Sequence, residues 1–319
     1  MENIKHIIKI CTLIDNILYN FFNEIEIIAS ENKFLGEIKM KILVTGTSGQ
    51  LGYDVIKVLK HRNIDCLGAD RSEFDITDYQ AAHKFIFDYK PDIIIHCSAY
   101  TSVDKAEDDV ALCRKVNAQG TENIAKICRE IDAKMVYIST DYVFPGIGEQ
   151  FYEVEDETGP TNIYGLTKLE GERVVQTLLN KYFIVRISWV FGFNGNNFVK
   201  TMLKLGEIHK ELNVVADQVG SPTYTADLAH LLCDMVATDR YGIYHATNEG
   251  TCSWAEFATE IFKQAGMHVK VNFITASQYI TKARRPANSR MSKDKLTKMG
   301  FKNLPKWQNA VARYLKELH

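Results

Sequence analysis

The sequence predicts an α/β fold in which a doubly wound parallel sheet carries a smaller α/β lobe at its C-terminal end. The first observation is a regular alternation of apolar, β-branched runs with helical stretches between residues 41 and 188. The second is a glycine-rich turn between the first strand and the first helix, and the third is the weakening of the alternation past Ser188. The 319 residues are 46% hydrophobic, which is enough to bury a core of this kind.

Five short apolar runs are predicted to be the strands of the sheet, at residues 41–45, 65–70, 91–99, 134–140 and 182–188. The run PDIIIHCSA (91–99) is apolar throughout, as in a strand that is buried on both faces. Helices are predicted between these strands, because right-handed crossovers require them. The first runs from the glycine turn to about Lys60, and the second lies within 77–90 and is capped by Thr77 or Asp78. The third runs roughly from 106 to 131, and the fourth from 162 to 179.

The C-terminal third is predicted to be a smaller lobe that packs against the sheet. Helices are expected at 198–210, 225–237, 253–266 and 305–318, and strands at 213–218 and 242–247. No flexible linker separates the two parts, because Gly and Pro fall between the elements. We therefore expect a first domain over 40–190 and a lobe over 191–319, with some segments of the lobe returning to the first domain.

The composition excludes several classes of protein. Lys and Arg total 38 against 40 Asp and Glu, a balance that argues against binding nucleic acid or a membrane surface. The seven cysteines are scattered, without CxxC or zinc-ligand spacing, so no metal site is predicted from them. Their odd number fits reduced thiols in a cytoplasmic protein. Neither HExxH nor GxSxG occurs.

The glycine turn predicts a dinucleotide site. Gly46, Gly49 and Gly52 lie between a strand and a helix, where a residue without Cβ allows a tight turn and a close approach to a pyrophosphate. The helix that follows offers free N–H groups to the phosphates. The intervening residues are therefore expected to contact the cofactor as well, namely Ser48, Gln50 and Leu51.

Asp70 ends the second strand 18 residues after Gly52, near the spacing expected for an acid that binds the adenosine ribose. Such a carboxylate favours NADH, whereas the adjacent Arg71 suits the 2′-phosphate of NADPH. Both cofactors therefore stay open, with NADH slightly favoured. The adenine is expected between Asp75 and Ile76. Small residues at the end of the third strand would let the cofactor cross the strand tips: Cys97, Ser98 and Ala99.

Tyr164 and Lys168 stand four residues apart in the predicted helix 162–179 and therefore share one face. The preceding strand ends at Thr140, and ligands of open α/β sheets bind outside such carboxyl ends. An ammonium ~4 Å from a phenol would lower the phenol's pKa by up to roughly 3 units. The three residues are thus predicted to be catalytic, with Tyr164 as proton donor to a ketone, Lys168 also holding the nicotinamide ribose, and Thr140 fixing the direction of the donated hydrogen bond.

Three stretches carry a family resemblance: GTSGQLG (46–52), STDYVF (139–144) and YGLTKLEGE (164–172). They resemble the extended short-chain dehydrogenase/reductase family. Five further stretches are similar to the dTDP-4-dehydrorhamnose reductases within it: TSVDKAE (101–107), SWVFG (188–192), GNNFVKTML (195–203), DQVGSPT (217–223) and ARRPANSRM (283–291). The resemblance begins at Met40 and runs almost to the C-terminus.

The resemblance implies a Rossmann domain with a small substrate-binding lobe, and NAD(P)H-dependent reduction of dTDP-4-dehydro-L-rhamnose to dTDP-L-rhamnose for polysaccharide biosynthesis. Thr140, Tyr164 and Lys168 carry over as the catalytic trio. The implied sugar contacts are Asp141, Tyr142 and Trp189, although an aromatic residue at 189 also suits a lobe interface. Arg284 and Arg285 match positions that grip the nucleotide diphosphate.

Some family members bind magnesium between subunits through glutamates. One of those positions is Asp54 here, which argues against metal-linked dimerisation and leaves a monomer and a homodimer both open. Two other functions stay open as well. One is reduction of a different nucleotide-4-keto-sugar. The other is a non-catalytic regulatory subunit of the kind that partners methionine adenosyltransferase, a role that places no demand on the catalytic trio.

Residues 1–39 match nothing in the resemblance, and no apolar stretch in them reaches the ~18 residues of a membrane span. They are interpreted either as an amphipathic helix or, preferably, as a segment upstream of the true start at Met40. A protein that begins at Met40 is therefore expected to keep its melting temperature and its turnover, which thermal unfolding and a kinetic assay would measure. A large loss of stability on truncation would show that the extension packs on the core.

Overall fold

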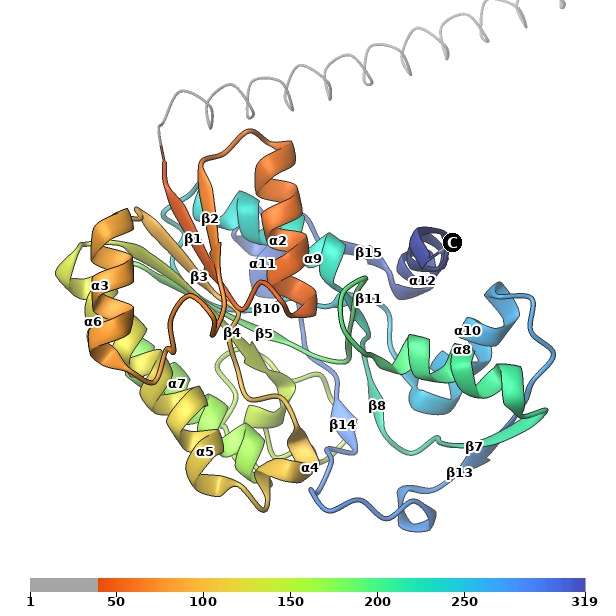
Figure 1. The fold of residues 1–319 in the computed structure, drawn as a ribbon. Coiled ribbons are helices and arrows are strands. Elements are labelled where there is room, and N and C mark those ends of the chain that lie inside the picture. Colours follow the sequence, from red (N-terminus) through yellow and green to blue (C-terminus); the bar gives the residue numbers. More distant parts are fainter. Residues whose placement is uncertain (1–39, 319) are drawn as a thin grey trace, which may run out of the picture.

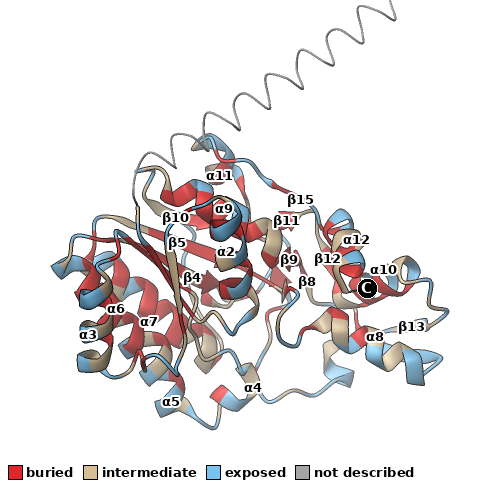
Figure 2. Ribbon diagram, turned by 45° about the horizontal axis from the view of Figure 1, so that its top comes forward, coloured by how far each residue is buried: buried red, intermediate tan, exposed pale blue. Residues whose placement is uncertain are grey.

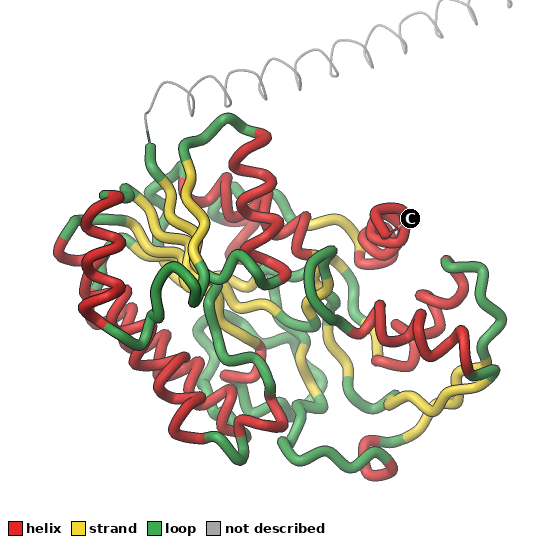
Figure 3. The backbone as a smooth tube through the Cα atoms, in the orientation of Figure 1, coloured by secondary structure: helices red, strands yellow, loops and turns green. Residues whose placement is uncertain are grey.

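The computed structural model describes residues 40–318, so the predictions for residues 1–39 lie outside the described part of the chain. Its centre is a parallel sheet with the strand order β10-β5-β4-β3-β1-β2 (Figures 1 and 3). The chain winds from β1 outward to β2 and then crosses back to β3, which is the doubly wound topology that the sequence predicts. The strands are β1 (Ile42–Thr45), β2 (Cys66–Ala69), β3 (Ile93–His96), β4 (Lys134–Thr140), β5 (Tyr182–Ile187) and β10 (Gly242–His245).

Helices cover both faces of this sheet, and each layer has its own apolar core (Figure 1). The side chains of alternate positions along β1 point to opposite faces: Ile42 and Val44 join one core, and Leu43 joins the other. This double burial explains why the strands read as unbroken apolar runs. One face carries α2 (Gln50–His61), α9 (Thr225–Val236) and α11 (Asp294–Lys298), and the other carries α3 (Tyr79–Tyr89), α6 (Thr121–Glu130) and α7 (Ile163–Leu178).

The predicted helical region 106–131 is found as a continuous helical stretch over 110–130, which starts later than predicted and is not uniform. The chain forms α4 (Val103–Ala106) and α5 (Val110–Arg114), then a π-helical segment, Lys115–Gly120, that leads into α6. Asn117 lies in the π-helical segment, where its side chain both accepts from the N–H of Tyr100 and donates to the carbonyl of Tyr100. The helix is irregular where it has to hold the loop that follows β3.

Side-chain caps fix several helix starts. Asp78 accepts from the N–H of Ala81 and begins α3, which decides between the two predicted caps. Asn162 caps α7 in the same way and so fixes the first turn of the helix that carries Tyr164.

The C-terminal lobe surrounds a separate, aromatic-rich core, and buried residues fill both bodies in Figure 2. Its main helices are α8 (Phe198–Ile208), α10 (Trp254–Gln264) and α12 (Trp307–Leu318). The predicted strand at 213–218 begins earlier, as β7 (Glu211–Val215), and pairs with β13 (Lys270–Ile274). Short strand pairs complete the lobe: β6 (Val190–Phe191) with β9 (Thr223–Tyr224), β11 (Asn248–Glu249) with β15 (Leu304–Lys306), and β8 (Val219–Gly220) with both β12 (Cys252–Ser253) and β14 (Asn288–Ser289).

Several elements from beyond residue 190 belong structurally to the sheet, among them β10, α9 and α11. β10 pairs in parallel with β5, and α9 packs against α2 (Figure 1). The chain therefore crosses between sheet and lobe several times, which holds the two bodies together without a linker. None of the helices between residues 40 and 318 combines the length and apolar character that a bilayer crossing requires.

A buried ion pair joins α7 to the sheet. Arg186 on β5 donates to both carboxylate oxygens of Glu172 at 2.9 and 2.8 Å, and the two side chains are 3% and 0% exposed. Arg186 also donates to the carbonyl of Val154 and lies over the ring of Phe144. The pair fixes the distance between β5 and the helix that carries Tyr164 and Lys168.

Replacing Glu172 with Gln should leave the guanidinium buried beside a neutral partner, and breaking a buried ion pair costs about 3–5 kcal/mol. The free energy of unfolding in urea measures this loss. Glu170→Gln on the same helix is the matched control, because its pair with Arg114 is partly exposed and should contribute below about 1 kcal/mol. Equal effects of the two substitutions would contradict the structural role of the buried pair.

Candidate active site

A cleft of about 870 Å³ lies outside the carboxyl ends of the central strands. The turns that follow β1 to β5 line it, together with α7 and two segments of the C-terminal lobe. All the residues predicted to contact the cofactor line this cleft, as do the three predicted catalytic residues. The cofactor set is Gly46, Ser48, Gly49, Gln50, Leu51, Gly52, Asp70, Arg71, Asp75, Ile76, Cys97, Ser98, Ala99, Tyr164 and Lys168.

The glycine turn is packed too tightly to hold a side chain. Gly46 has a φ of +73°, and a Cβ there would lie 2.8 Å from the backbone nitrogen of Ser98. A Cβ on Gly52 would collide with the carbonyl oxygen of Gly46. Helix α2 begins directly after the turn, its N-cap Gly49 has no side chain to fill the first N–H groups, and no acid stands in its first turn. These N–H groups at the cleft are suited to an anion.

Asp70 is held at the tip of β2 by the glycine turn. One carboxylate oxygen accepts from the hydroxyl of Thr47 at 2.8 Å, and the other accepts from Ser48 at 3.0 Å. Arg71 is 87% exposed and its guanidinium lies 3.4 Å from the carboxylate of Asp75. Asp70 is therefore fixed in place, whereas Arg71 is a solvated side chain with freedom to turn.

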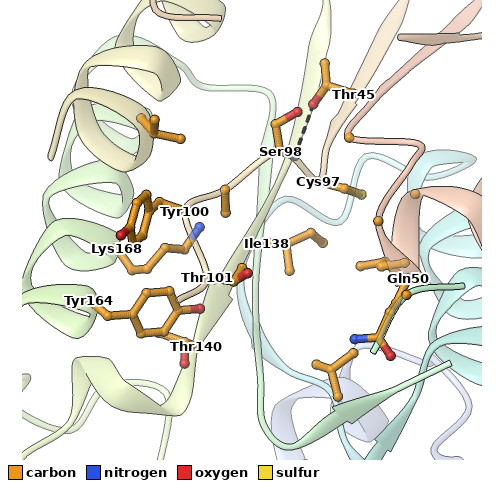
Figure 4. Close-up of a pocket in the computed structure, with 18 of the residues that line it drawn as sticks. Thr45, Gln50, Cys97, Ser98, Tyr100, Thr101, Ile138, Thr140, Tyr164 and Lys168 are labelled. Atoms are coloured by element: carbon orange, nitrogen blue, oxygen red, sulfur yellow. Dashed lines mark hydrogen bonds between the residues drawn. The ribbon is translucent and has the colours of Figure 1, made fainter. Parts of the chain in front are cut away.

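Tyr164 and Lys168 project from α7 on the same side, toward the end of β4 (Figure 4). Tyr164 and Thr140 lie beside one another in the cleft (Figure 4). Lys168 is 2% exposed, and its ammonium lies 4.1 Å from the centre of the Tyr137 ring. The phenol of Tyr137 in turn donates to the carbonyl of Lys168, which fixes the backbone of that turn.

The expected lowering of the Tyr164 pKa is wrong for this structure. Burial raises the pKa of Tyr164, and the nearby carboxylate of Asp141 raises it further. Burial also lowers the pKa of Lys168 to about 7, although Glu172 opposes the shift. A lysine that is only partly charged near neutral pH is a weak electrostatic partner, so Tyr164 keeps its proton, as a proton donor must.

The predicted sugar contacts meet in the cleft, whereas the predicted diphosphate contacts do not. Asp141, Tyr142 and Trp189 line it, and the ring of Tyr142 meets that of Tyr164 edge-on at 5.6 Å. Arg285 is instead bound to both carboxylate oxygens of Asp104 at 3.0 and 2.8 Å. Arg284 is exposed, and neither arginine lines the cleft.

Sequence reasoning missed several residues of the cleft. Trp254, from α10 of the lobe, stacks on Trp189 with 3.7 Å between the ring centres. Trp189 itself has a φ of +49°, an uncommon conformation for a large side chain, at the point where the chain leaves β5. Residues after β3 could have been found from their place beyond a strand end, but no local signal marks Trp254. The missed residues include Tyr100, Thr101, Val103, Asn196 and Trp254.

Asp54 does not point outward as an intersubunit metal ligand would. It is 1% exposed, its carboxylate accepts from Thr225, and burial raises its pKa. Between residues 40 and 318, no group of three or more His, Cys, Asp or Glu side chains is arranged to hold a metal ion.

The family described as RmlD substrate binding domain matches residues 40–319. The chain belongs to this family. The spore coat polysaccharide biosynthesis protein SpsK of Bacillus subtilis is 39% identical over 278 residues, which cover 87% of this chain and 97% of the relative. The dTDP-4-dehydrorhamnose reductase of Aggregatibacter actinomycetemcomitans is 40% identical over 284 residues, covering 85% and 97%.

A solved structure of dTDP-4-dehydrorhamnose reductase from Bacillus anthracis, in complex with NADP, has the same fold. It is 42% identical to this chain, covers 88% of this chain and 100% of its own, and superposes with a TM-score of 0.86. The residues that the family model matches, 40–319, include those that the sequence resemblance covers.

Proposed function

We propose that this protein reduces the 4-keto group of dTDP-4-dehydro-L-rhamnose to give dTDP-L-rhamnose, with NADH or NADPH as the reductant. The observation that supports this most is the meeting of Thr140, Tyr164 and Lys168 with the glycine turn in one cleft. The matching family is described as a substrate-binding domain, and relatives of this chain are named dTDP-4-dehydrorhamnose reductase. The product would serve the synthesis of cell-surface polysaccharide.

The cleft suits a nicotinamide dinucleotide on chemical grounds. The first N–H groups of α2 and the tight turn at Gly46 would bind the diphosphate, and Asp70 would accept from a ribose hydroxyl. Each oxygen of Asp70 accepts one internal hydrogen bond and keeps a lone pair for a ligand. A bound reduced nicotinamide supplies the hydride for the reaction.

The protein's own residues supply the proton and the orientation. Tyr164 is neutral, because burial raises its pKa, and it donates its proton to the ketone oxygen as negative charge develops there. Lys168 would bind the nicotinamide ribose, and its protonated form would favour the phenolate that remains after transfer. Burial of Thr140 and Lys168 keeps water from competing for the same hydrogen bonds, while Tyr164 is only partly exposed at the cleft.

Asp141, Tyr142 and Trp189 are our proposed neighbours of the sugar nucleotide. Arg284 and Arg285 could reach the diphosphate if Arg285 exchanges Asp104 for a phosphate, since a guanidinium binds both with paired hydrogen bonds. We propose no metal requirement, because Asp54 is enclosed within the protein. A monomer and a homodimer both fit this function.

Two alternatives remain to be separated from this function by experiment. A reductase of another nucleotide-4-keto-sugar would use the same trio with a different sugar. A regulatory subunit would need no proton donor, so the trio would have no role in it. Absorbance at the reduced-nicotinamide band, with dTDP-4-dehydro-L-rhamnose and each cofactor in turn, separates the proposed function from both alternatives: only the proposed reductase oxidises the cofactor with this sugar.

Tyr164→Phe removes the phenolic oxygen and keeps the ring that meets Tyr142. Cofactor affinity should change little, while loss of a general acid should lower kcat ~100- to 10,000-fold. Lys168→Met should weaken both kcat and cofactor binding, because it removes a ribose contact as well. The control is Tyr182→Phe at the other end of the sheet, which should leave kcat unchanged. A Tyr164→Phe protein with nearly wild-type kcat would exclude the proposed role of Tyr164.

Asp70→Ala tests the cofactor preference. The carboxylate should repel a 2′-phosphate, so the wild type should use both cofactors with NADH preferred, and the variant should shift toward NADPH. The ratio of kcat/KM for the two cofactors measures the shift, with the exposed Asp88→Ala as control. An unchanged ratio in Asp70→Ala would mean that Asp70 does not face the ribose.

A further inference from the structure

A chain of hydrogen bonds connects the proposed catalytic trio to the C-terminal lobe. The hydroxyl of Thr140 donates to one carboxylate oxygen of Asp141 at 3.0 Å. The other oxygen of Asp141 accepts from the hydroxyl of Ser289 at 2.5 Å. Thr140, Asp141 and Ser289 are all buried, with exposed fractions of 5%, 4% and 2%. Each oxygen of the carboxylate is therefore occupied from within the protein.

These contacts determine what the hydroxyl of Thr140 can do. A hydroxyl has one hydrogen to donate and two lone pairs to accept with. The hydrogen of Thr140 goes to Asp141, and one lone pair accepts from the N–H of Tyr142 at 3.3 Å. One lone pair of the hydroxyl remains, and Thr140 lines the cleft beside Tyr164 (Figure 4). With Asp141 ionised, Thr140 therefore acts on Tyr164 as an acceptor and has no hydrogen left for the ketone oxygen.

Ser289 reaches this position because the lobe holds its strand firmly. It lies on β14, where it pairs in register with Gly220 of β8. Gly220 is pressed between Ser289 and the ring of Trp189: a Cβ there would lie 2.9 Å from the former and 3.0 Å from the latter. The serine hydroxyl is thus placed by the fold of the lobe, 148 residues away in sequence from its partner.

We propose, on the basis of the reductase function proposed above, that Asp141 and Ser289 are positioning residues that fix the hydrogen-bond direction of Thr140 and thereby aim the phenol of Tyr164. Asp141 then acts through Thr140, and each oxygen of its carboxylate keeps one lone pair for a neighbouring sugar hydroxyl. Ser289 keeps that carboxylate ionised and in place from the lobe.

The protonation of Asp141 gives this arrangement a measurable signature. Burial raises the pKa of Asp141 to about 6, while the hydrogen bonds from Ser289 and Thr140 lower it. The titratable groups around it are the phenols of Tyr142 and Tyr164. Arg285 and Asp104 act in turn on Tyr142. Lys168 lies on the same helix face as Tyr164. Below its pKa, Asp141 becomes a donor to Thr140 and releases the threonine hydrogen. Activity should therefore fall as the pH drops through about 6.

Ser289→Ala removes one of the hydrogen bonds that favour the ionised carboxylate. Loss of a hydrogen bond to a charged group should raise the midpoint of the acid limb of kcat by about one pH unit, and lower kcat at pH 6 about fivefold. The KM for the sugar nucleotide should stay unchanged. The matched control is Ser221→Ala, because Ser221 is equally buried in the lobe but donates to the carbonyl of Gly250. It should leave the acid limb in place.

A second measurement does not depend on turnover. The side-chain carboxyl of Asp141 can be titrated by NMR in protein labelled with 13C-aspartate, with Asp141→Asn to assign the signal. Its pKa should rise in Ser289→Ala and stay constant in Ser221→Ala. The inference would be overturned if Ser289→Ala changed neither the midpoint of the acid limb of kcat nor the pKa of Asp141 measured by NMR. A wild type without reductase activity would overturn the proposed function, and the titration would still decide whether Ser289 controls Asp141.

Discussion

The close approach of Gly46 to the backbone of Ser98 is the constraint on which the cleft depends. The turn after β1 rests directly on the chain that leaves β3, and there is no space for a Cβ between them. The strand order reverses between these two strands, so the crevice of a doubly wound sheet opens here. Helix α2 consequently starts at the floor of the cleft with its N–H groups toward a ligand, and Asp70 is drawn to the turn by Thr47 and Ser48.

The wall of the cleft opposite the glycine turn is formed by α7 and the ends of β4 and β5. Its folding has a free-energy cost, because it buries ionisable groups. The fold handles each of these groups differently. Glu172 and Arg186 neutralise one another within hydrogen-bond distance. Asp141 is stabilised by hydroxyl donors, Lys168 has a pKa of about 7, and Tyr164 keeps its proton because its pKa is raised. A buried charge is tolerated only when it is paired, hydrogen-bonded or discharged, and all three solutions occur along one helix and one strand end.

The C-terminal lobe is part of the site rather than a cover for it. Trp254 stacks on Trp189 at the exit of β5, and Ser289 binds Asp141 at the exit of β4. Because β10 and α9 return to the sheet, the lobe is tied to the sheet on both sides of these contacts. The N-cap residue of α8 contributes too, since Asn197 donates to Gln50 in the first turn of α2.

The sequence by itself determined the parallel sheet, the glycine turn, Asp70 and the pairing of Tyr164 with Lys168. These features follow from local rules: apolar runs of strand length, a turn that excludes Cβ, and the i, i+4 spacing of a helix face. Only the tertiary structure decided the π-helical segment before α6, where Asn117 holds Tyr100, and the pairing of Arg285 with Asp104, 181 residues away. It also decided the direction of the Tyr164 pKa and the link from Ser289 to Asp141. Burial and contacts between distant segments are properties of packing, and no local pattern of residues encodes them.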